Sequence, residues 1–162
     1  MKLLESSGQR IVFGLGMREK SFLERLLSFY PLRPEGPALL SRGGVGDASL
    51  GEATEWLGEA LKQQQDSLSQ WIRTRLQGGA GLTLQDGAWR LCLEGADADR
   101  LLRVLNELRV NAWVRLGSPE NLDDPSLASA PGQAPLVAIM MLAGEFEVAL
   151  LRAMQAGSAG GG

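Results

Sequence analysis

Histidine is absent from this chain, and cysteine occurs once, as Cys92. Without histidine the chain cannot form a Ser-His-Asp triad, a Cys-His dyad, a histidine-ligated zinc site or a haem with a histidine ligand. A single cysteine cannot form a disulfide within the chain, which fits a reducing compartment and predicts a cytoplasmic protein. These absences exclude many kinds of catalytic site, and we expect a non-enzymatic protein with no cofactor and no bound metal.

The sequence also lacks a concentration of charge and a long apolar run. Its 16 Lys and Arg are scattered among 19 Asp and Glu, and the net charge is −3. This leaves no basic face for nucleic acid and no polybasic segment for anionic lipid. The longest apolar stretch, residues 134–143, is about half the length that spans a bilayer and predicts a buried core helix. We therefore expect neither a nucleic-acid partner nor a membrane.

The residues that are present suit one α+β domain. Of the 162 residues 44% are apolar, which is enough for a hydrophobic core. Apolar periodicity predicts about four helices, so the domain should be mainly helical, and alternating segments predict short N-terminal and central β-hairpins. The helices are expected at 17–30, 52–77, 97–116 and 135–155, and the hairpins at 2–14 and 82–93.

Domain boundaries follow from composition. Residues 1–156 are predicted to form a single domain, and the glycine-rich residues 157–162 a flexible tail. Segments 31–51 and 117–134 are rich in proline, glycine, serine or aspartate, and we expect both to be surface loops.

Arg109 falls at the edge of the apolar stripe of the helix at 97–116. An unpaired buried charge is strongly destabilising, so this arginine needs a partner. The helix at 135–155 offers Glu145 and Glu147. We predict that Arg109 pairs with one of these two glutamates, and that the pair fixes the register of the two helices rather than binding a ligand.

Two other features support alternative functions. Cys92 alternates with two leucines in the central hairpin, so its thiol would face away from the core and could act as a redox sensor. Glu120, Asp123 and Asp124 could bind a hard cation or act as acid and base in a carboxylate enzyme. Buried cysteines and solvated loop carboxylates are the more common outcomes, so both functions stay alternatives.

Residues 90–109 combine a short strand, a helix start at Asp97, and an Asn-Asp-Leu-Arg-like motif that runs from Asn106 to Arg109, with Glu107 in place of aspartate. Together they resemble an uncharacterised bacterial family, a domain of unknown function often encoded beside the Clp-protease adaptor ClpS. The resemblance implies a regulatory or adaptor role without an established enzymatic activity.

We therefore predict a regulatory or adaptor domain that acts through protein–protein interaction. Such a domain should expose an apolar patch. The candidate positions are Trp56, Trp113, and the far side of the fourth helix at Val137, Met141 and Val148. That far side could instead be covered by the hairpins, or by a second subunit in a homodimer.

Overall fold

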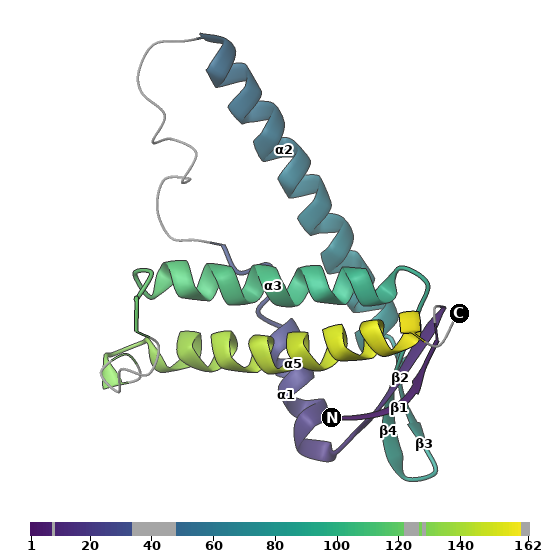
Figure 1. The fold of residues 1–162 in the computed structure, drawn as a ribbon. Helices are drawn as coiled ribbons and strands as arrows, with labels where there is room; N and C mark the ends of the chain where they lie inside the picture. The colour runs from purple at the N-terminus through teal and green to yellow at the C-terminus, as the bar shows by residue number, and fades with distance from the viewer. Residues whose placement is uncertain (8, 34–47, 122–126, 128, 160–162) are drawn as a thin grey trace.

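A computed structural model of the chain describes residues 1–7, 9–33, 48–121, 127 and 129–159 (Figure 1). Within these ranges four α-helices accompany a four-stranded antiparallel sheet. The predicted α+β, mainly helical fold with an N-terminal and a central hairpin is therefore confirmed.

The sheet is built from two hairpins that lie side by side in the strand order β1-β2-β4-β3. The strands are β1 (Lys2–Ser6), β2 (Arg10–Leu15), β3 (Leu82–Gln85) and β4 (Ala88–Glu94). β2 and β4 join the hairpins, with Phe13 opposite Leu91. In the central turn Asp86 and Gly87 have φ angles of 53° and 77°. Positive φ at both positions is what a two-residue Asp-Gly hairpin turn requires, and it explains why this local signal was reliable.

Helices α3 and α5 lie antiparallel against each other, α1 crosses beside α5, and α2 runs away from this body (Figure 1). The bounds are α1 (Met17–Leu27), α2 (Ala48–Trp71), α3 (Asp97–Arg115) and α5 (Ala134–Ala159), and a π-helix η2 (Ile72–Gln77) continues α2. The core lies where the inner face of the sheet meets α1, α3 and α5. Its completely buried large side chains are Leu23, Leu26, Leu91, Leu93, Val104, Leu105, Leu108 and Leu150.

Several helix ends differ from those expected. α1 ends three residues early, at Leu27, because the N–H groups of Phe29 and Tyr30 donate three residues back, to the carbonyls of Leu26 and Leu27, in turns tighter than an α-helix. α2 begins at Ala48, so the expected loop 31–51 is shorter, and its residues 34–47 lie outside the described part of the chain. In the expected loop 117–134, residues 122–126 and 128 are likewise not described.

The C-terminal end of α5 packs against the first hairpin. The helix continues to Ala159, although a flexible tail was expected from residue 157. A Cβ atom on Gly157 would lie 2.8 Å from Oγ of Ser6, and that hydroxyl donates a hydrogen bond of 2.6 Å to the carbonyl of Ala153. Glycine therefore lets the hairpin approach the helix closely, and residues 160–162 are outside the described ranges.

Helix α5 is only partly the buried core helix that was expected. Ala143, Phe146 and Leu150 on one face are buried, whereas Met141 and Val148 on the opposite face are exposed. By length and composition alone α5 could cross a membrane, since an 18-residue window within Ala134–Gly157 has a mean hydropathy of 1.8, and 28% of that window is buried. The apolar stretch predicted from the sequence was too short to span a membrane because it was taken to end at Ala143, before Gly144 and a glutamate. The expected absence of a membrane stays a prediction.

Candidate interaction surface and its polar anchor

The outer half of α2 stands away from the rest of the molecule (Figure 1). All side chains from residue 55 to residue 63 are exposed, although three of them are large and apolar. Trp56 is 79% exposed, the highest value for a large apolar side chain in the described ranges, and Leu57 and Leu61 are 48% and 46% exposed. We call Trp56, Leu57, Ala60 and Leu61 the α2 stripe.

The α2 stripe is the outward continuation of a face that is buried at the base of the helix. At 100° per residue, the stripe shares its face with Gln64, Leu68 and Trp71. Leu68 and Trp71 are buried in the core, and Gln64 Nε2 donates a hydrogen bond of 3.5 Å to Oε1 of Glu107 on α3. The charged residues of this part of α2 lie on the other face: Glu55, Glu59, Lys62 and Asp66. One amphipathic face therefore begins inside the protein and ends in solvent.

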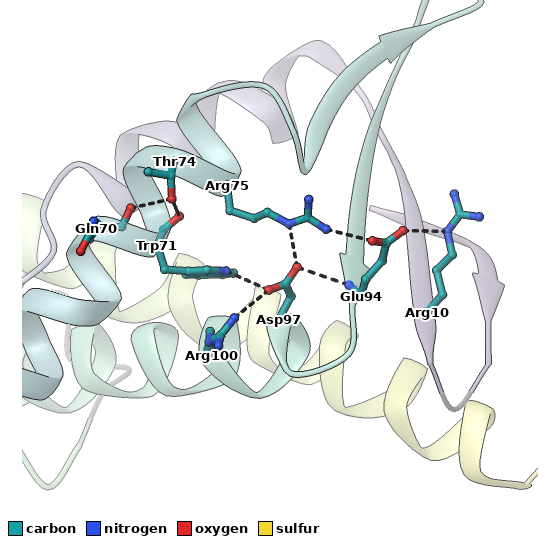
Figure 2. Close-up of polar contacts among 8 residues, drawn as sticks. All are labelled: Arg10, Gln70, Trp71, Thr74, Arg75, Glu94, Asp97 and Arg100. Atoms are coloured by element: carbon teal, nitrogen blue, oxygen red, sulfur yellow. Dashed lines mark hydrogen bonds and ion pairs between the residues drawn. The ribbon is translucent and has the colours of Figure 1, made fainter.

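A buried carboxylate holds the base of α2 to the body (Figure 2). Asp97 is 4% exposed and is the one buried charged residue of the described chain. Its Oδ1 accepts hydrogen bonds from Trp71 Nε1 at 2.9 Å and from Arg100 Nη1 at 3.2 Å. Its Oδ2 accepts from Arg75 Nε at 2.9 Å and from the backbone N–H of Glu94 at 3.4 Å. Four donors from α2, η2, β4 and α3 thus converge on one side chain, which we call the Asp97 clasp.

The Asp97 clasp keeps its carboxylate ionised. Burial raises the pKa of Asp97, but the hydrogen bonds from Arg75, Trp71 and the Glu94 backbone outweigh it, and the pKa falls below its ordinary 3.8. A carboxylate offers about four lone-pair positions, and four donors occupy them here. Asp97 therefore has no acceptor left for a substrate, and its role is to fix α2 to the body.

The π-helix η2, which begins directly after Trp71, the last residue of α2, brings one of these donors, Arg75, into place. The Thr74 hydroxyl donates a hydrogen bond of 2.9 Å to the Gln70 carbonyl, next to the point where the helix widens (Figure 2). Such a side-chain bond competes with the helical ladder and bends it. Arg75 then reaches Glu94 Oε2 at 3.0 Å as well as Asp97, which ties η2 to β4.

The sequence predicted a helix start at Asp97 but no contact of its side chain with another element. Ala96 is the N-cap, and Asp97 is the first helical residue, with its side chain turned to Trp71 and Arg75. The partners stand 26 and 22 residues away in the sequence, and no local pattern links them. The one available signal was the spacing of Trp71 and Arg75, which places an indole N–H and a guanidinium near the end of a helix.

Arg109 forms an ion pair between α3 and α5. Its Nε lies 2.7 Å from Oε2 of Glu147, so Glu147 is the partner among the two glutamates considered, whereas Glu145 is exposed. Nη2 of Arg109 also donates to Oδ1 of Asn106 at 3.0 Å, which places the family-motif asparagine in the same group. The Glu147 side chain is 12% exposed and that of Arg109 is 44% exposed. Water therefore screens one end, and the pair contributes to helix packing only modestly.

The residues of the two alternative functions are not brought together. Cys92 is half-buried on the outer face of the sheet, while Leu91 and Leu93 face the core, as the alternation predicted. Glu120 is exposed, and Asp123 and Asp124 lie outside the described residues. Among the side chains that the structure describes, no group of three or more Cys, Asp or Glu is arranged to hold a metal ion.

Of the two other predicted patches, Trp113 is already engaged, whereas Met141 and Val148 on the far side of α5, at 60% and 48%, are about as exposed as the leucines of the α2 stripe. Trp113 is only just exposed, and its Nε1 donates a hydrogen bond of 3.2 Å to the Pro119 carbonyl. On the far side of α5, Met141 and Val148 are exposed, and Val137 is half-buried. The far side of α5 is thus a second apolar surface that the described residues leave uncovered.

Comparison with family models, with curated proteins and with solved structures finds no match for this chain. The resemblance of residues 90–109 to the family encoded beside ClpS therefore stays a prediction.

Proposed function

We propose that this chain is a non-enzymatic regulatory or adaptor domain, and that the α2 stripe is the surface that meets its protein partner. The observation that carries the proposal is Trp56, 79% exposed at the outer end of an apolar stripe on a helix that leaves the body. Tryptophan is one of the residue types that are enriched in interface hot spots.

The energetics of a helix with an exposed apolar face favour an interaction role for the α2 stripe. Most of the stability of helices in proteins comes from packing an apolar face. All side chains of residues 55–63 are exposed, yet they carry such a face. A partner that covers the α2 stripe would supply the missing packing.

The Asp97 clasp fits the same proposal. It fixes the base of α2 through Trp71 and Arg75, so the outer half is held in a defined direction. A helix that is already oriented loses less conformational freedom when it binds. A groove on the partner would then bind the apolar side chains that recur at helical spacing, as in other helix-in-groove complexes.

Site-specific photo-crosslinking tests this proposal. A photoreactive benzophenone amino acid is placed at Leu57 or Leu61, and at Lys62 on the opposite face as the matched control, in cells that produce the protein. We expect crosslinked protein adducts from positions 57 and 61 and none of comparable yield from position 62. No adduct from the stripe, or equal adducts from both faces, would refute an interaction role for α2.

A further inference from the structure

We infer that the partner on the α2 stripe is a second copy of this chain, with the two α2 helices packed antiparallel in a symmetric dimer. The inference rests on the proposed function, because it names the occupant of the same surface. Isologous dimers, in which one patch meets its own copy, are the most common symmetric assemblies.

The α2 stripe is continuous with a helix face that is already packed within the chain. At its base the face of α2 packs on α3 through the bond from Trp71 to Asp97 and the contact from Gln64 to Glu107. Beyond Gln64 the face continues as the α2 stripe without its neighbour. A second helix laid on Trp56, Leu57 and Leu61 continues the packing that α3 begins.

With their exposed fractions of 79%, 48% and 46%, Trp56, Leu57 and Leu61 offer together about 350 Å² of apolar surface, given that a large aromatic side chain buries about 150–250 Å². Two copies offer about 700 Å², which is below the 1,200–2,000 Å² of a stable interface and corresponds to a weak, concentration-dependent dimer.

Glu55, Glu59 and Lys62 lie on the opposite face from the stripe, so two copies can meet without bringing like charges together. The base of each stripe is already buried in its own body, so parallel helices would force the two bodies into the same space. The antiparallel arrangement places the bodies at opposite ends of the helix pair, and it also opposes the two helix dipoles.

Sedimentation equilibrium of the full chain from about 1 to about 100 µM, a range that covers weak and strong dimers, tests the inference. We expect a concentration-dependent species of twice the 17.4 kDa of one chain. Trp56→Glu should weaken the dimer at least about 100-fold, because a hot-spot residue is lost from both copies. Two matched controls should leave it unchanged: Glu59→Gln on the charged face of α2 and Met141→Glu on the far side of α5.

The direction of the helices has its own measurement. In a Cys92→Ser background, Arg73→Cys places a spin label on exposed η2, at the base of α2. At 1.5 Å per residue, antiparallel helices centred on the stripe separate the two labelled positions by about 43 Å. Parallel helices would hold the bases near the usual interaxial spacing of about 10 Å.

Three results overturn the inference. The first is a monomer at about 100 µM whose circular dichroism shows α2 intact. The second is a dimer that survives Trp56→Glu or dissociates with Met141→Glu, and the third is a short distance between the labels. In each case adducts from Leu57 to another protein would still support the proposed function, whereas their absence would remove both.

Discussion

The substitution Asp97→Asn replaces one carboxylate oxygen of the Asp97 clasp by an amide that donates hydrogen bonds. If the remaining oxygen keeps Trp71, the new NH2 group faces Arg75 Nε, which now lies 2.9 Å from Oδ2. Two donors then meet where a charged pair had formed. Arg75 loses its buried counter-charge and keeps only its contact with Glu94 at the surface.

The magnitude follows from burial. Removing one partner of a fully buried pair costs about 3–5 kcal/mol of unfolding free energy. The Arg75 side chain is 31% exposed, so water recovers part of that loss. We therefore expect a loss of about 2–3 kcal/mol, and since 1 kcal/mol shifts the Tm of a chain of this size by about 2–4 °C, a fall in Tm of roughly 5–10 °C.

Thermal and urea unfolding near neutral pH measure this loss, with Glu94→Gln as the control. Glu94 contacts Arg75 at the surface, where an ion pair contributes at most about 1 kcal/mol, so the control should fall by no more than a few degrees. A Tm for Asp97→Asn within about 1 °C of the unsubstituted protein, a shift of less than 1 kcal/mol, would refute the assignment of Asp97 as the anchor of α2.

The pH dependence of the difference is a second check. The pKa of Asp97 is below its ordinary value of 3.8 in the folded state, because its hydrogen bonds outweigh burial. Its contribution to stability is therefore fully present above 3.8 and is lost as the pH falls through the lower folded pKa. The difference in unfolding free energy between the unsubstituted protein and Asp97→Asn should stay constant from neutral pH down to about 3.8 and shrink below that pH.

Two further predictions concern the other polar contacts. Burial and the 2.8 Å hydrogen bond to Glu107 raise the pKa of Tyr30, the single tyrosine of the chain, above its ordinary value of 10.0. We therefore expect Glu107→Gln to lower the pH at which Tyr30 ionises, as measured by ultraviolet titration. An unchanged titration in this variant would contradict the contact. Arg109→Met should lower the Tm by about 2–4 °C, equivalent to about 1 kcal/mol, because Glu147 is left without its counter-charge. The double variant Arg109→Met with Glu147→Met should recover most of this loss. An unchanged Tm in the single variant would contradict a structural role of the pair.

Local signals in the sequence were enough for the two hairpins and for the existence of each helix, but not for the pairing of β2 with β4 that joins the hairpins into one sheet. Alternation around Asp86 and Gly87 defines a hairpin without any information from elsewhere in the chain. The pairing of Arg109 with Glu147 was also within reach, since a charge at the edge of a core stripe needs a counter-charge on the facing helix.

What the sequence could not predict depends on contacts between distant residues. The Asp97 clasp joins Asp97 to Trp71 and Arg75 across more than twenty residues, and helix periodicity does not state which elements meet. The same limit applies to α2. Its amphipathic pattern shows that one face should be covered, but the pattern is the same whether the cover is the chain itself or another molecule.

Because residues 55–63 are exposed, selection for folding stability and selection for function should act on them differently. Folding stability constrains positions such as Leu68 and Trp71, whose side chains are buried, but it is nearly indifferent to Trp56, Leu57 and Leu61. A deep mutational scan scored by protein abundance should therefore tolerate polar residues along the outer half of α2. Scored by growth of the native host, the same library would reveal whether evolution retains an exposed tryptophan there for a reason other than the fold.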